Sequence, residues 1–105
     1  AKGGWHLHFS KKITGELFVK LSPNTMKHFF CPSVDEMFFS ASKAFDAKNI
    51  LAVELTGIGD DGADGMVALR KKGAYTLGES EDSAVVYGMP KMAYERGGVV
   101  KQLPA

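Results

Sequence analysis

The sequence is poor in cysteine, in long apolar stretches and in net charge, and each shortage excludes a class of protein. Cys31 is the only cysteine, so no disulfide can form within the chain, and a reducing cytoplasm is the expected compartment. No apolar run approaches the roughly 18 residues that a membrane helix needs, and no signal-peptide pattern opens the chain. The formal net charge of +1 creates no broad field that would attract nucleic acid or a membrane. We therefore expect neither a nucleic-acid partner nor membrane insertion.

The length and composition indicate one globular unit. A chain of 105 residues forms one domain at most, and its 45% hydrophobic content is that of an ordinary soluble protein. The chain starts at Ala1, in mid-pattern and without methionine, which indicates a fragment of a longer domain.

The order of the hydrophobic patterns predicts an α/β fold. Residues 5–22 alternate between apolar and polar side chains around Gly15, as in a β-hairpin. A capping box from Ser33 to Glu36 then starts a pattern with helical spacing. Three short apolar runs follow, separated by two helical patterns; the runs lie at 49–57, 74–78 and 99–103. This alternation predicts βαβ units and a doubly wound, mostly parallel sheet.

Glu54 disturbs the first of these apolar runs. A carboxylate inside a buried strand is costly unless it is paired. We therefore expect Glu54 to lie at an edge or to find a partner.

Four glycines and three aspartates crowd into "LTGIGDDGADG", residues 55–65, directly behind that run. A calcium loop starting at Asp60 is disfavoured, because its third position is Gly62 and its twelfth is Lys71 instead of oxygen ligands. The letters also match the G-x-G-x-x-G pattern of dinucleotide-binding turns. However, Asp60 and Asp61 would repel a pyrophosphate at that place. The turn therefore predicts neither a metal nor a nucleotide.

Two other interpretations of the aspartates stay open. In open α/β sheets, ligands bind beyond the carboxyl ends of the strands, where such a turn lies. Glycines allow the sharp turn that would aim one carboxylate into a catalytic crevice. Alternatively, Asp60, Asp61 and Asp64 cap the helix that follows.

Cys31 raises a separate possibility. A Cys/His nucleophile pair with His28 is conceivable. A lone cysteine beside Phe29 and Phe30 is more often a buried small hydrophobe, and we favour that interpretation.

Three blocks of sequence together carry a family resemblance. They are "PSVDEMFFSA", "ELTGIGDDGADGMVALRKKGAYTL" and "SAVVYGMPKMA". In this order and spacing, the chain resembles the chemotaxis receptor methylesterase family (CheB type) from about Ala1 to Pro104. The resemblance implies a serine hydrolase that removes methyl groups from glutamate γ-esters on chemoreceptors and that often deamidates receptor glutamines.

The resemblance also implies a Ser-His-Asp triad on a doubly wound α/β domain. The family's aspartate precedes the glycine of "GxDG", which is Asp61 here. Its carboxylate would fix the histidine tautomer and stabilise the imidazolium. The family's serine and histidine belong to segments that this chain does not contain. His6 matches a histidine of the family's opening pattern, but neither His6, His8 nor His28 matches the triad base.

Several positions depart from the family pattern and put substrate details in doubt. Ile58 replaces a methionine, Cys31 an arginine and Glu79 a glutamine. Lys2 and Gly4 replace a proline and an aspartate in the opening loop.

We therefore predict that residues 1–105 are the C-terminal part of a methylesterase catalytic domain, with a hairpin at about 5–22 and a βαβ-type remainder at about 32–105. Asp61 is the predicted catalytic residue, and Gly57, Ile58 and Gly59 are predicted to line the site. No metal or other cofactor is expected, because ester hydrolysis needs only the triad, oxyanion donors and water. The implied partners are methyl-accepting chemotaxis receptors and, in the full protein, a response-regulator receiver domain. We expect the isolated chain to be inactive and to self-associate through exposed sheet surface. The alternative is a catalytically inactive binding or structural module derived from this fold.

Overall fold

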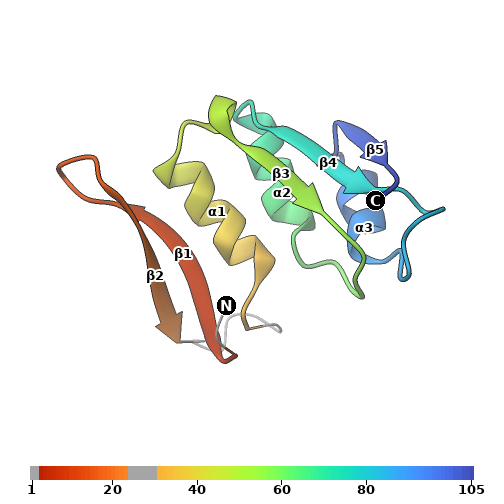
Figure 1. Cartoon of the computed structure of the whole chain (residues 1–105), viewed down its shortest axis with the longest axis horizontal. Helices are drawn as coiled ribbons and strands as arrows, with labels where there is room; N and C mark the ends of the chain where they lie inside the picture. The colour runs from red at the N-terminus through yellow and green to blue at the C-terminus, as the bar shows by residue number, and fades with distance from the viewer. Residues whose placement is uncertain (1–2, 24–30) are drawn as a thin grey trace.

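The computed structural model describes residues 3–23 and 31–105. These residues form an antiparallel hairpin, a parallel sheet and the helices that connect the parallel strands (Figure 1). The elements in chain order are β1 (Trp5–Lys11), β2 (Leu17–Pro23), α1 (Val34–Ala44), a short 3₁₀ helix η1 (Ala47–Asn49), β3 (Leu51–Glu54), α2 (Ala63–Lys71), β4 (Tyr75–Glu79), α3 (Met89–Glu95) and β5 (Lys101–Leu103). The α/β fold with an N-terminal hairpin, as expected from the sequence, is confirmed.

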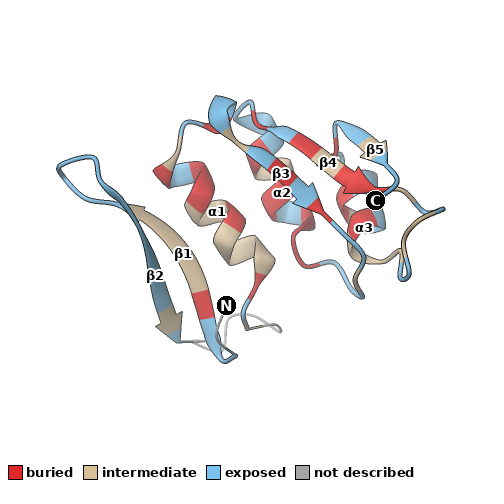
Figure 2. Ribbon diagram, viewed as in Figure 1, coloured by how far each residue is buried: buried red, intermediate tan, exposed pale blue. Residues whose placement is uncertain are grey.

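The parallel sheet has the order β3-β4-β5, with α2 and α3 as the crossover helices. Leu51 pairs with Tyr75 across the first two strands, and Leu77 pairs with Lys101 across the next two. Along β3, exposed and buried residues alternate, which is visible as alternating colours in Figure 2. The buried face is the one behind which α2 and α3 lie in Figure 1. The opposite face of β3 carries Leu51 and Val53 into solvent.

The core lies between the helices and this buried face of the sheet. Met66, Leu69 and Thr76 are fully buried, and the Thr76 hydroxyl donates to the Gly98 carbonyl at 2.6 Å. α1 and α2 approach closely at Gly65, where an added Cβ would lie 2.6 Å from the Cβ of Phe38. This close contact brings the start of α1 next to the turn that precedes α2.

The helix boundaries follow the local signals of the sequence. The Ser33 side chain caps α1 by accepting from the Glu36 N–H at 3.5 Å. The residue after the C-cap of α2 is Gly73, with a φ of 107° that favours glycine. α3 begins at Met89 with Pro90 in its first turn, where the missing N–H has no consequence.

The hairpin packs against α1. The Phe9 N–H donates to the Ser40 hydroxyl at 2.9 Å, and the rings of Phe9 and Phe45 meet edge to face with centroids 5.3 Å apart. β1 and β2 pair in register from Trp5 opposite Pro23 to Lys11 opposite Leu17. The hairpin therefore lies against α1, on the side opposite to α2 (Figure 1).

Candidate active site

The turn after β3 is fixed at its start by Gly57, which bonds the segment before α3 through both its N–H and its carbonyl. The Gly57 N–H donates to the Val86 carbonyl at 3.1 Å, and the Gly57 carbonyl accepts from the Met89 N–H at 2.8 Å. Further along, Gly59 and Gly62 have φ values of 91° and 94°, so both adopt the left-handed conformation that favours glycine. The backbone thus reverses sharply before α2 and presents Asp61 toward α1.

Asp61 binds the N-terminus of α1. Its Oδ1 accepts from the Ser33 hydroxyl at 2.9 Å and from the Asp35 N–H at 3.0 Å, and its Oδ2 accepts from the Val34 N–H at 2.8 Å. These are unsatisfied donors of a first helical turn, and the positive end of the helix dipole favours a carboxylate there. The residue is 9% exposed. Asp61 is therefore held in one orientation by a helix that lies far away in the sequence.

The aspartates do not cap the helix that follows them. The N-cap of α2 is Gly62, which has no side chain, and the Gly65 N–H of the first turn donates to Asp35 of α1 at 2.7 Å. Asp60 and Asp64 instead pair with Arg96, at 2.7 Å and 3.1 Å. The hydrogen bond that Arg96 donates to Asp60 is the largest of the causes that raise the pKa of Arg96. The capping interpretation is therefore wrong for α2, and the cap that Asp61 does provide belongs to α1.

Ser33 contacts Asp61, and His6 contacts Ser33, but the three residues do not form a triad. In a triad, the serine hydroxyl gives its proton to the histidine, and the aspartate binds the other side of the imidazole. Here the Ser33 hydroxyl donates to Asp61, and His6 accepts the Ser33 backbone N–H at its Nδ1, at 3.1 Å. The bonds run in the wrong order for nucleophilic attack by Ser33, so the two residues position Asp61 and α1.

Two more carboxyl groups surround Asp61. Burial, with smaller contributions from the charges of Asp61 and Asp35, raises the pKa of Glu54 to about 8. Burial is also the largest cause that raises the pKa of Asp35, whose carboxyl accepts the Gly65 N–H at 2.7 Å. Glu54 is 3% exposed, and its Oε1 has no hydrogen-bond partner among residues 3–23 and 31–105. Glu54 thus lies on a strand at the edge of the described sheet, as one of the two expectations had it, and its raised pKa favours the protonated form at neutral pH.

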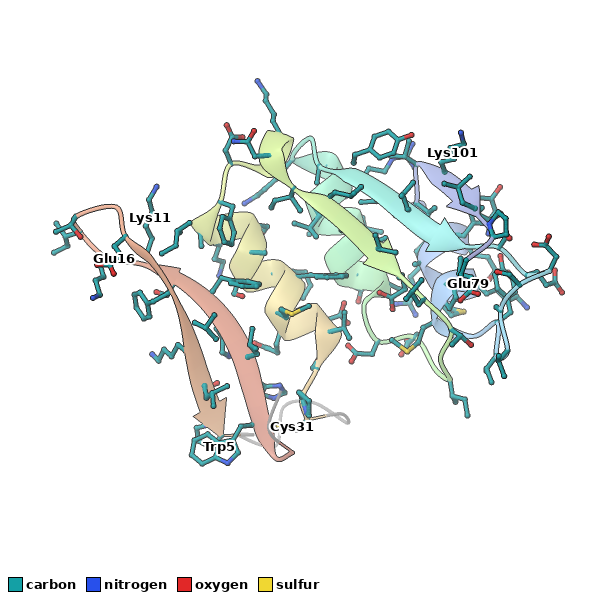
Figure 3. All side chains as sticks on the ribbon, in the orientation of Figure 1. Trp5, Lys11, Glu16, Cys31, Glu79 and Lys101 are labelled. Carbon is teal, nitrogen blue, oxygen red and sulfur yellow. The ribbon has the colours of Figure 1, made fainter. Side chains whose placement is uncertain are left out.

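Glu79 fixes the start of the turn from the neighbouring strand. It lies at the end of β4 (Figure 3) and is 6% exposed. Its carboxylate accepts from the Thr56 N–H and from the Ser83 hydroxyl, both at 2.8 Å. The position at which the sequence departs from the family's glutamine therefore has a structural task next to the site.

The residues predicted to line the site differ in their exposure and in whether their N–H groups are free to bind a ligand. Ile58 is 79% exposed and projects from the turn. The Gly57 N–H is already bound to Val86, so it cannot serve a ligand, whereas no hydrogen bond from the N–H groups of Ile58 or Gly59 occurs within the described ranges.

Cys31 is partly buried, and its carbonyl accepts from the Gly4 N–H at 3.3 Å. In Figure 3 it lies at the end of the hairpin, away from Glu79. His28, the other half of the conceivable nucleophile pair, lies outside the described residues, as do Phe29 and Phe30.

Two general features of the described residues complete the site's surroundings. Within these residues, no three His, Cys, Asp or Glu side chains are grouped so that they could hold a metal ion. A search of the same residues finds no helix with the length and apolar character needed to cross a bilayer.

The sequence did not predict Ser33, Asp35 and Glu54 as neighbours of Asp61, or His6 as a neighbour of Ser33. The capping box marked Ser33 as the start of a helix, and Glu54 stood out as a carboxylate in an apolar strand. Nothing in the spacing indicated that both meet at Asp61, because those contacts are between elements.

Comparisons with known proteins identify relatives along the whole chain. A family model described as CheB methylesterase matches residues 1–105. A protein-glutamate methylesterase/protein-glutamine glutaminase of Caldanaerobacter subterraneus subsp. tengcongensis is 42% identical over 106 residues, which cover 100% of this chain and 29% of that protein. A protein with the same description from Carboxydothermus hydrogenoformans is 45% identical over 105 residues, covering 99% of this chain and 30% of the relative.

The fold has a counterpart among solved structures. The crystal structure of the Thermotoga maritima CheB methylesterase catalytic domain superposes with a TM-score of 0.90 at 31% identity, over 99% of this chain and 54% of that one. The chain thus spans less than a third of the length of these two curated relatives and about half of the solved domain. With a family model along its full length and relatives above 40% identity, the chain belongs to the CheB methylesterase family.

Proposed function

We propose that this chain is the part of a protein-glutamate methylesterase catalytic domain that supplies the orienting aspartate, Asp61, of a Ser-His-Asp triad. The serine and the histidine belong to a segment of the family domain that is not among these residues. The activity is hydrolysis of glutamate γ-methyl esters on methyl-accepting chemotaxis receptors, and deamidation of receptor glutamines. In this proposal the chain alone is inactive.

The hydrogen bonds of Asp61 carry the proposal. A carboxylate accepts about four hydrogen bonds. Three of these positions are taken, two on Oδ1 and one on Oδ2. One lone pair of Oδ2 therefore remains for a further donor, and the residue keeps 9% of its surface exposed. A histidine N–H arriving from outside this segment would meet a carboxylate whose orientation is already fixed.

The chemistry follows from that orientation. Asp61 would accept the Nδ1–H of the histidine, which leaves the other ring nitrogen free to take the proton of the attacking serine. The imidazolium formed in that step would be stabilised by the negative charge of Asp61. The N–H groups of Ile58 and Gly59 are the donors of this turn that remain for an oxyanion.

The test joins this chain to the upstream half of the Thermotoga maritima catalytic domain and measures methanol release from methylated chemoreceptor membranes. We expect release from the fusion and none from the 105-residue chain alone. Asp61→Asn should lower the rate constant of the fusion by about 10³- to 10⁴-fold, since a triad amide favours the wrong histidine tautomer.

Asp64→Asn is the matched control, because Asp64 lies three residues away and faces Arg96 instead of α1. Equal rates for the fusion and its Asp61→Asn variant would contradict the role of Asp61. Release from the isolated chain would mean that a nucleophile exists among its own residues.

One observation favours the alternative of an inactive binding module. β3 is an edge strand of the described sheet and exposes Leu51 and Val53, which are 62% and 46% accessible. An apolar edge of this kind favours pairing with another chain. We propose that the isolated chain self-associates there, so sedimentation should show species larger than a monomer that Leu51→Lys dissociates. A compact monomer at all concentrations would contradict this.

A further inference from the structure

Glu54 is a buried titratable group that the proposed chemistry does not use. It ends β3, directly before the turn that carries Asp61, and it is 3% exposed. Its Oε1 has no hydrogen-bond partner within the described part of the chain. A carboxyl group in such a place costs stability, so its neighbours must show what its presence does for the site.

The carboxyl group of Glu54 lies directly beneath Gly62. A Cβ added to Gly62 would lie 2.5 Å from Oε1 and 2.6 Å from Oε2. Gly62 follows Asp61 and has a φ of 94°, so the chain reverses on top of the Glu54 side chain. Any movement of the Glu54 carboxyl group therefore acts on the backbone that holds Asp61.

The charged groups around Glu54 are mostly carboxylates. Asp61 on the turn and Asp35 on α1 both disfavour a charge on Glu54, and Asp64 acts in the same sense on Asp35. Arg96, after α3, is taken up by Asp60 and Asp64.

On β4, the residue paired with Glu54 is Gly78, which has no side chain. The next residue, Glu79, holds its carboxylate on Thr56 and Ser83. Within the described ranges, nothing compensates an ionised Glu54.

We propose that Glu54 is a positioning residue for Asp61: its neutral carboxyl group supports the turn at Gly62, and its ionisation displaces this turn and loosens the bonds between Asp61 and α1. The inference deepens the proposed function, on which its catalytic meaning rests. Burial raises the pKa of Glu54 to about 8, so the change falls at mildly alkaline pH. Above that pH a charged Glu54 would repel the Asp61 carboxylate. Movement of the glycine turn between the two side chains would reduce this repulsion at the lowest energetic cost.

The test follows the Val34 and Asp35 amides by NMR between pH 6 and 10, because these N–H groups donate to Asp61. It uses the 105-residue chain with Leu51→Lys, the substitution expected to keep it monomeric. Both amide signals should shift with the same midpoint as the Glu54 side-chain carbon, near pH 8. In Glu54→Gln, which keeps the shape of the side chain and cannot ionise, both shifts should disappear. Glu95→Gln, on the exposed face of α3, is the matched control and should leave them in place.

Three results would overturn the proposal. The first is titration of Glu54 near the ordinary glutamate value. The second is a high midpoint for Glu54 that the amides of Val34 and Asp35 do not follow. The third is loss of native signals throughout the chain over the same range, since the coupling would then not be confined to the turn.

A second measurement separates this inference from the proposed function. In the active fusion, methanol release should fall above about pH 8, and Glu54→Gln should remove the fall that tracks the amide midpoint. An inactive fusion with titrating amides would refute the proposed function alone. An active fusion whose alkaline limit is unchanged in Glu54→Gln would refute the role of Glu54 alone.

Discussion

Replacing Asp61 with alanine should destabilise the fold far more than loss of an ordinary helix cap. The change removes the acceptor of three bonds, from the Ser33 hydroxyl and the N–H groups of Val34 and Asp35. A hydrogen bond to a charged group contributes about 1.5 to 3 kcal/mol, and the donors left behind are partly shielded from water. Two of the three bonds are only partly buried, so we use the low end of that range, and the gross loss is about 5 kcal/mol.

Part of that loss is offset by the neighbouring carboxyl group of Asp35. The charge of Asp61 raises the pKa of Asp35, so its removal relieves repulsion there, whereas Glu54 is protonated at pH 6 and feels none. Burial is the larger cause of the Asp35 shift, which limits the relief to about 1 kcal/mol. The expected net loss in the free energy of unfolding is about 4 kcal/mol, against about 1 kcal/mol for a usual N-cap.

Urea unfolding followed by circular dichroism at pH 6 measures this loss. Asp61→Asn should cost less, about 1 to 2 kcal/mol, because its amide oxygen can keep the two bonds made by Oδ1 while its NH₂ group faces the Val34 N–H. Asp64→Ala, an exposed position in the first turn of α2, should cost about 0.5 kcal/mol or less. A loss of 1 kcal/mol or less for Asp61→Ala would refute the view that this carboxylate anchors α1 to the turn.

Three further perturbations follow from the same contacts. Between about pH 4.5 and 8 the unfolded state ionises Glu54 while the folded state keeps it protonated, so the free energy of unfolding should fall as pH rises, by about 3 kcal/mol at pH 7. Glu54→Gln should remove that decline in urea titrations at several pH values, and a parallel pH profile for the two proteins would contradict it. Gly62→Ala should cost about 3 kcal/mol, since it strains a φ of 94° and places a Cβ 2.5 Å from Glu54. Gly15→Ala, at a φ of 91° with no atom within 4 Å, should show only the backbone cost of about 1 kcal/mol; equal losses at both glycines would exclude the clash. Arg96→Ala breaks its pairs with Asp60 and Asp64, which are largely in solvent, so thermal unfolding should show a loss of about 1 kcal/mol that shrinks at high salt; a salt-independent loss would point to packing instead.

The helix ends and the hairpin turn could be predicted from the sequence, because the residues that specify them are close together in the chain. The capping box at Ser33 marks the start of α1, Gly73 marks the end of α2, and Pro90 lies in the first turn of α3. Each signal acts within one or two turns of the chain, so the hydrogen bonds it makes do not depend on the rest of the fold. The same is true of Gly15 in the hairpin, at a φ of 91°.

The contacts of Asp61 could not be predicted in this way. An aspartate before a helical pattern suggests a cap for that helix, but the bonds reach across the fold to α1, 26 to 28 residues earlier. Which helix receives the carboxylate depends on the close approach of α1 and α2 at Gly65, and that approach is a property of packing. The environment of Glu54 could not be predicted from local sequence either. Its carboxyl group is buried, its Oε1 has no described partner, and the fold tolerates it because its raised pKa favours the protonated form.

Asp61 has both a structural role, in its bonds to α1, and a proposed catalytic role, so its presence alone does not establish activity. The motif that carries the family resemblance includes this aspartate, and the proposed chemistry gives it a catalytic role. Yet the three bonds to α1 would preserve it for folding even in a protein that catalyses nothing. An inactive module of this fold would therefore also keep Asp61, Gly62 and the capping box at Ser33. The choice between enzyme and inactive module depends on whether a histidine N–H reaches the remaining lone pair of Oδ2. Two measurements on Asp61→Asn distinguish that bond from the other three. The loss of stability reports on the three bonds to α1, and any loss of rate in the fusion beyond it reports on the bond to the histidine.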